Sequence, residues 1–136
     1  MKNKNGMTLI ELLAVLVILV IVLIIAAPKI RDLISTSREK IFSTNVTEAL
    51  NIVTTDFQSN YAGALSIEVT YTFANKSITV NGSPINKAKN IDLVGSITID
   101  NDGRKSLSLK DDNYCAIKSY SDTEISIYDI DNVLCD

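Results

Sequence analysis

Hydrophobic and polar residues divide the chain into three successive patterns, and the first is a long apolar run near the N terminus. No polar side chain interrupts residues 12–27, and one carboxylate, Glu11, lies at the leading edge of this run. As a helix, residues 7–27 would extend ~30 Å, which is enough to cross the hydrocarbon layer of a bilayer. A charged group costs ~2.5–3.5 kcal/mol at mid-membrane and less near the interface. Glu11 therefore indicates a functional charge with a partner, or a side chain that reaches back to the headgroups.

The second pattern is amphipathic and predicts a helix over residues 29–60. Apolar residues recur at three- and four-residue steps, and polar residues fill the other side. We expect the apolar face to pack under a globular head. Its members are Ile30, Leu33, Ile34, Ile41, Val46, Ala49, Leu50, Val53 and Phe57.

Pro28 separates the two helical patterns. A proline inside a helix removes the hydrogen bond to the carbonyl four residues earlier, here that of Ile24, and its ring clashes with that turn. Two interpretations remain open from the residues alone: a helix that stops at the membrane surface, or a kink within one continuous helix over residues 7–60.

The third pattern begins at residue 65, where the period changes from helical to alternating and predicts β-strands. The first strand sets Ile67, Val69, Tyr71 and Phe73 on one face. Further strands are expected at residues 78–80, 96–100, 106–109, 114–120 and 124–130. Residues 74–76 and 101–104 are predicted hairpin turns, and residues 81–84 a loop. The sequence thus predicts an α+β protein: a long N-terminal helix packed against one face of a C-terminal antiparallel sheet, arranged as a meander.

Composition and charge narrow the function classes. The 136 residues include 13 Lys and Arg against 16 Asp and Glu, and residues 61–136 hold seven basic and eleven acidic groups. An acidic distal half argues against direct nucleic-acid binding. The chain has no histidine, the commonest general base and metal ligand, so no ordinary catalytic triad can form. We expect no enzyme, no metal and no cofactor, while paired carboxylates leave an enzymatic domain as a weak alternative.

The N-terminal charges suggest an orientation. Lys2 and Lys4 precede the apolar run and favour a cytoplasmic N terminus, with everything after Pro28 outside, although basic residues also follow the run. The alternative is a secretory signal peptide, because Ala26 and Ala27 resemble a small-residue cleavage site. Sixteen unbroken apolar residues are long for a signal core, and such a core has no use for the carboxylate at its leading edge.

The same N-terminal stretch combines a short basic leader ending in Gly6, a Thr-Leu-Ile-Glu opening from Thr8 to Glu11, and a long apolar helix, GMTLIELLAVLVILVIVLIIAAP. In this combination, roughly residues 1–30 resemble type IV pilins and related pseudopilins. The resemblance implies that a prepilin peptidase cuts between Gly6 and Met7 on the cytoplasmic side and methylates the new amine of Met7. It also implies that Thr8 and Glu11 act in filament assembly, with Glu11 neutralising that amine on a neighbouring subunit. A free amine and a carboxylate are each costly in an apolar core, and pairing lowers the joint cost.

The resemblance also implies how the chain is divided. Residues 1–6 would be the leader, residues 7–28 the membrane and filament-core helix, and residues 29–136 an extracytoplasmic head with the pilin fold. It favours the kink at Pro28 over the helix stop. Many pilins carry a helix-weakening glycine midway along the apolar run, whereas this chain has Val20 there.

Cys115 and Cys135 are the only cysteines. Outside the cytoplasm such a pair predicts a disulfide, since two cysteines without histidine are too few ligands for structural zinc. The bridge would stabilise the chain by ~3 kcal/mol in the loop-entropy model. The alternative is two unpaired thiols.

Two oxygen-rich clusters, residues 100–102 and 111–113, offer ligands that calcium could use. Neither has the twelve-residue calcium loop with its closing glutamate, and turn chemistry explains both equally well.

The expected function is that of a structural subunit. It would wait in the cytoplasmic membrane, be processed by prepilin peptidase, and be polymerised with copies of itself and related pilins by a membrane assembly machinery into a surface filament. A pseudopilin of a type II secretion or DNA-uptake system is the alternative within the family. A lone membrane-anchored binding or enzymatic domain is the alternative from another class.

Overall fold

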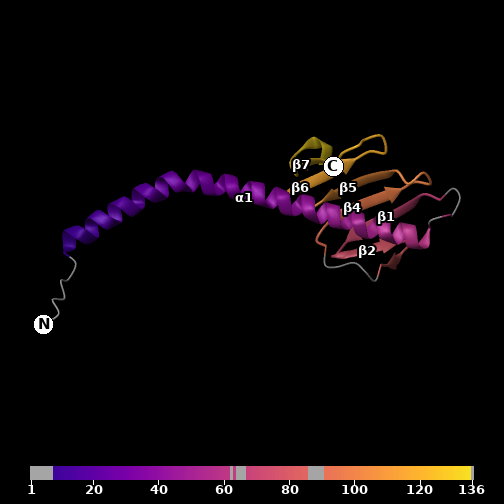
Figure 1. Ribbon diagram of the computed structural model, residues 1–136, viewed down its shortest axis with the longest axis horizontal. Coiled ribbons are helices and arrows are strands. Elements are labelled where there is room, and N and C mark those ends of the chain that lie inside the picture. Colours follow the sequence, from indigo (N-terminus) through magenta and orange to yellow (C-terminus); the bar gives the residue numbers. More distant parts are fainter. Residues whose placement is uncertain (1–7, 62, 64–66, 86–90, 136) are drawn as a thin grey trace. The chain divides into compact units, whose positions relative to one another are not determined.

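The computed structural model describes residues 8–61, 63, 67–85 and 91–135. They form one long helix, a seven-strand antiparallel sheet and a final 3₁₀ turn, so the predicted α+β class is confirmed (Figure 1). The chain divides into two compact units, Met1–Arg38 and Glu39–Asp136. The first unit contains the N-terminal part of the helix. The second, called the head below, contains the rest of the helix and the whole sheet.

Helix α1 spans Leu9–Asn60 and continues through Pro28. The interpretation of Pro28 as a helix stop is therefore wrong. Proline removes one backbone hydrogen bond and costs a helix ~3 kcal/mol, but the long helical stretches on both sides supply many other bonds and keep the helix continuous. The alternative role of Pro28, a kink within the continuous helix, stays a prediction.

The sheet has the strand order β3-β2-β1-β4-β5-β6-β7. The strands are β1 Val69–Ala74, β2 Ser77–Val80, β3 Ser83–Pro84, β4 Val94–Ile99, β5 Lys105–Lys110, β6 Tyr114–Lys118 and β7 Ser126–Asp129. The expected meander is wrong at one connection, because the chain leaves β3 and returns to the far side of β1 before forming β4. This makes β1 an internal strand. The two-residue β3, which contains Pro84, lies at the edge of the sheet, where a short strand with a proline is best tolerated.

Tight turns join several of the strands. Asn75 and Lys76 connect β1 to β2, with φ of 51° and 59° as in a two-residue type I′ turn, which confirms the first predicted hairpin. Asn81 and Gly82 connect β2 to β3 in a similar way, with φ of 50° and 77°. The predicted loop over residues 81–84 is therefore wrong in its second half, since those residues pair with β2 as strand β3. The predicted turn at residues 101–104 lies between β4 and β5 as expected.

The head has one hydrophobic core, formed by α1 and one face of the sheet. On the helix, the core residues Phe42, Val46, Ala49 and Val53 follow three- and four-residue spacing, and each is at most 1% exposed. The sheet and the segment that leads into β4 contribute Val69, Tyr71, Phe73, Ile78, Ile91, Leu93, Ile97, Ile99, Leu107, Leu109 and Ala116.

The helix face that was predicted to be buried is buried toward the C-terminal end of α1. Before that, the prediction is wrong. Phe42, which the prediction omitted, is 1% exposed, and its ring centroid lies 5.8 Å from that of Tyr114. Its neighbour Ile41 is 61% exposed. Adjacent helical residues point about 100° apart, so only one of the two can face the sheet, and the larger aromatic ring takes that position. The other expected core residues that are exposed are Ile30, Leu33 and Ile34.

A buried hydroxyl links α1 to β1. Tyr71 has no exposed surface, and its hydroxyl donates to Oδ2 of Asp56 at 3.0 Å. Burial, together with the neighbouring carboxylate, raises the pKa of Tyr71 above its usual range. Asp56 also accepts a hydrogen bond from the Asn60 side chain at 2.8 Å. The helix is thus held on the sheet by one polar contact in addition to the apolar core.

Cys115 on β6 and Cys135 at the end of the 3₁₀ helix η1 (Val133–Cys135) form the predicted disulfide. Their Cα atoms lie 5.7 Å apart, and both side chains are buried. The alternative of two unpaired thiols is therefore wrong. The bridge ties the last turn of the described chain to the sheet.

Candidate assembly site on the N-terminal helix

The N-terminal part of α1 presents an apolar surface on all sides. Every large apolar side chain over residues 9–25 is exposed, by between 45% at Val15 and 86% at Leu9. By length and composition, α1 can cross a membrane, and none of its most apolar window is buried. Fully burying a Leu, Ile or Val side chain is worth on the order of 1.5–3 kcal/mol. The free energy gained when lipid or other helices cover this segment is therefore larger than that of any single polar contact.

Thr8 and Glu11 form a capping box at the start of α1. The Thr8 backbone N–H donates to Oε2 of Glu11 at 2.8 Å, and the Thr8 hydroxyl donates to the same oxygen at 3.0 Å. In return, the Glu11 backbone N–H donates to the Thr8 hydroxyl at 3.4 Å. These bonds satisfy donors that the first turn of a helix otherwise leaves without partners. The structure thus brings together the two residues that the resemblance assigns to filament assembly.

This geometry gives Glu11 a role within its own chain. The carboxylate stabilises the helix start, where a negative charge also complements the helix dipole. Glu11 has no basic partner among the residues that the structure describes. Its predicted pairing with the amine of a neighbouring subunit stays a prediction. The predicted cleavage residues Gly6 and Met7, with the methylated amine of Met7, lie outside the described residues.

The two oxygen-rich clusters of the head are occupied by turn hydrogen bonds. One carboxylate oxygen of Asp100 accepts from the backbone N–H groups of Asp102, at 3.0 Å, and Arg104, at 2.7 Å. The other accepts from Nε of Arg104 at 2.8 Å. Burial works against the charged form of Asp100, but the hydrogen bonds from Arg104 and Asp102 outweigh it and hold the pKa of Asp100 below its ordinary value. Asp111 similarly accepts from the N–H groups of Asn113 and Tyr114.

These contacts favour the turn interpretation of both clusters over the calcium interpretation. No group of three or more His, Cys, Asp or Glu side chains suited to a metal occurs in the described part of the chain.

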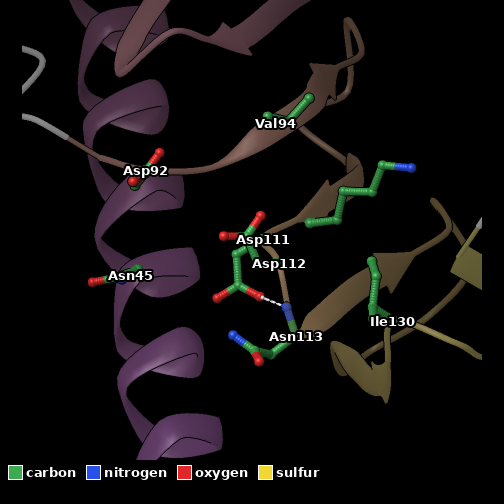
Figure 2. A pocket seen from close by; sticks show the side chains of 8 residues that line it. Asn45, Asp92, Val94, Asp111, Asp112, Asn113 and Ile130 are labelled. Carbon is green, nitrogen blue, oxygen red and sulfur yellow. Dashed lines mark hydrogen bonds between the residues drawn. The ribbon is translucent and has the colours of Figure 1, made fainter.

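The head also contains an open groove with a volume of about 540 Å³. Figure 2 shows Asn45 on α1, Asp92 just before β4, Val94 at the start of β4, the turn after β5, and Ile130 after β7 around it. The full lining is Asn45, Asp92, Val94, Lys110, Asp111, Asp112, Asn113 and Ile130. Three of these residues are acidic and one is basic, so the groove is negatively charged.

Comparison with known proteins gives one match. Residues 1–27 match the family model described as the prokaryotic N-terminal methylation motif. No curated protein and no solved structure matches the chain. The chain therefore carries the type IV pilin-type signal, which supports a type IV pilin-like or pseudopilin-type protein. The motif implies prepilin peptidase processing and pilus-type assembly in general, and together with the apolar helix it fits membrane anchoring before assembly.

Two features of these sites were missed by sequence reasoning. The capping box has a readable signal, since Thr8 and Glu11 have the spacing of the S/T-x-x-E pattern just before an apolar run. The groove has no such signal, because its lining comes from separate segments that only the strand order brings together.

Proposed function

We propose that this chain is a structural subunit of a type IV pilus, cleaved by prepilin peptidase between Gly6 and Met7 and methylated on the new amine of Met7. Copies of α1 would pack together as the filament core and display the heads on the cell surface, for adhesion, motility or aggregation. The observation that carries this proposal is the exposed apolar segment of α1, which begins with the Thr8–Glu11 cap and lies within the methylation motif.

The apolar segment supports a polymer because it can exchange one apolar environment for another. Lipid covers it while the subunit waits in the membrane, with the N terminus on the cytoplasmic side. Neighbouring helices cover it in the filament, so extraction from the membrane does not expose it to water. The head requires no partner for its own core, and we expect it to have no catalytic activity.

Processing is tested by mass spectrometry of the protein isolated from its native cells. We expect a mature chain that starts at Met7 and is one methyl group heavier than the unmodified sequence. A mature chain that starts at Met1, or beyond Ala27, would contradict the proposal.

Assembly is tested by substituting Glu11. Because removing one partner of a buried charge pair costs ~3–5 kcal/mol, Glu11→Ala should reduce the yield of sheared surface filaments by roughly a hundredfold or more while leaving membrane insertion unchanged. Glu11→Gln is the matched variant, since glutamine also completes a capping box but carries no charge. Loss of filaments in both variants supports charge pairing. Normal filaments from Glu11→Gln would mean that Glu11 acts only as a helix cap.

The pseudopilin alternative predicts a different polymer. Electron microscopy of cells expressing a tagged copy should show long surface fibres for a pilin. Short fibres that stay within the cell envelope would favour a pseudopilin, and no fibres at all would favour a lone membrane-anchored domain.

A further inference from the structure

A second exposed apolar stripe on α1 follows Pro28, still within the N-terminal unit. Ile30, Leu33 and Ile34 lie on one side of the helix by their three- and four-residue spacing, and they are 52%, 67% and 47% exposed. This stripe lies beyond the uninterrupted apolar run that would span the hydrocarbon layer of a bilayer.

Cations flank the stripe. Arg31 and Arg38 are seven residues apart, close to two helical turns, and therefore lie together along one side of the stripe. Lys29 lies on its other side, and Asp32 on the opposite face of the helix. Neither Arg31 nor Arg38 makes an ion pair or hydrogen bond with any residue that the structure describes. We call the surface formed by Lys29, Ile30, Arg31, Leu33, Ile34 and Arg38 the basic face.

The groove of the head has the complementary character. Val94, 52% exposed, gives it an apolar wall, and Asp92, Asp111 and Asp112 give it negative charge (Figure 2). Among the described residues, the Asp92 carboxylate forms one exposed ion pair, 3.5 Å from Nζ of Lys76. The Asp112 side chain is exposed and has no ion pair or hydrogen bond within the described residues. An arginine side chain could therefore enter without breaking a buried contact of the head.

We propose that the basic face of one subunit docks against the acidic groove of a second copy of this chain, with Arg31 or Arg38 paired with Asp92 and Asp112. The proposal rests on the proposed function, which brings many copies close together. Because the two surfaces are different parts of one chain, their contact is head-to-tail. Contacts of that kind propagate into open helical polymers when they do not close into a ring. Charge complementarity would set the register between neighbours, which apolar packing alone specifies poorly.

An anionic lipid surface is the other partner that a basic, apolar helix face can have. Two observations favour a second copy. Arg38 follows Pro28 by ten residues, or ~15 Å of helix, which exceeds the ~5–8 Å thickness of one headgroup layer. A lipid partner would also leave the acidic groove without a role.

The test is charge exchange in the full-length chain, read as the yield of sheared filaments. Arg31→Asp/Arg38→Asp and Asp92→Arg/Asp112→Arg should each lower the yield roughly tenfold, because like charges then meet at the contact. Combining the four substitutions should restore at least half of the wild-type yield. Glu124→Arg is the control for a single charge reversal, since it replaces one carboxylate with arginine at an exposed position at the opposite end of the β6–β7 hairpin, and it should leave the yield unchanged.

Direct contact is tested by placing a photo-reactive residue at position 38. We expect crosslinks to a second copy, mapped by mass spectrometry to the peptide that contains Asp112. Crosslinks to lipid alone, charge variants that assemble normally, or a four-substitution chain without rescue would each overturn the docking proposal. Filaments that still require Glu11 would then leave the proposed function intact, whereas a wild-type chain that forms no filaments would overturn the proposed function itself.

Discussion

The two units of this chain bury their apolar residues in opposite ways. In the head, α1 and the sheet cover each other, and Ala49, Val53, Tyr71 and Ile97 have no exposed surface. In the N-terminal unit, the large apolar side chains from Leu9 onward are at least 45% exposed through residue 25. The head therefore has a core of its own, whereas the apolar segment of the N-terminal helix has none. One continuous helix joins the two.

The largest expected effect comes from removing residues 1–28, which contain the apolar run of the N-terminal unit. A chain that starts at Lys29 should change from a membrane protein that requires detergent to a water-soluble protein, because the apolar surface of residues 9–25 is gone. It should still unfold in one cooperative transition, followed by circular dichroism. Loss of cooperative unfolding would mean that the head needs the N-terminal segment for its stability.

Within the head, the next largest effect is expected at Phe42. Phe42→Ala should reduce the free energy of unfolding by ~3–5 kcal/mol, because it leaves a cavity where the ring packs near Tyr114. The adjacent substitution Ile41→Ala, at an exposed position, should change it by no more than about 0.5 kcal/mol. Chemical denaturation measures both, and equal effects would refute the assignment of the buried face of α1.

The disulfide should stabilise the head but not the apolar segment of α1. Replacing both Cys115 and Cys135 with alanine should lower the free energy of unfolding of the head by ~3 kcal/mol in the loop-entropy model. The helicity of the apolar segment in detergent should not change. A parallel loss of helicity there would show that the two units are coupled.

A smaller effect is expected at the polar contact between α1 and β1. Tyr71→Phe removes the donor to Asp56 and should cost ~1–2 kcal/mol in thermal unfolding. Tyr128→Phe is the control, since the Tyr128 hydroxyl has no partner among the described residues. If both substitutions had the same effect, the contribution of Tyr71 would come from its ring and not from its hydroxyl.

The smallest expected effect is on the stability of the head at acidic pH, through Asp100. Because the pKa of Asp100 is lower in the folded head than its ordinary value of 3.8, its contribution to stability is fully present above that value. The contribution is lost as the pH falls through the lower folded pKa. Asp100→Asn should therefore flatten the loss of stability below pH 3.8, measured as the unfolding midpoint against pH. The control Asp131→Asn removes an exposed carboxylate and should leave the wild-type slope.

Local patterns predicted the parts of the fold that depend on neighbours in sequence. Alternation predicted the buried face of β1, and the turn at Asn75 and Lys76 follows from residues that tolerate a left-handed backbone. The disulfide followed from the presence of only two cysteines in a chain expected to lie outside the cytoplasm. The strand and the turn could be predicted because their conformation depends on residues close together in sequence. The disulfide could be predicted because each cysteine has only one possible partner in the chain.

Two of the errors lie where distant segments of the chain compete for one position. Whether Ile41 or Phe42 faces the sheet depends on what stands opposite, and Tyr114 lies 72 residues further along the chain than Phe42. The return of the chain to the far side of β1 likewise depends on which strand offers the better edge. Periodicity along one element contains neither piece of information.

The amino-acid sequence alone determined that this protein has an apolar N-terminal helix with an acid at its start, an acidic head, and one cysteine pair. The apolar run and the three-residue spacing of Thr8 and Glu11 belong to one helix, so their effects do not depend on contacts with the rest of the fold. The tertiary structure decided which face of α1 is buried, which strand lies inside the sheet, and that an acidic groove forms beside Asn45. These features depend on side chains that meet only after the chain has folded, since burial is shared between surfaces that are far apart in sequence.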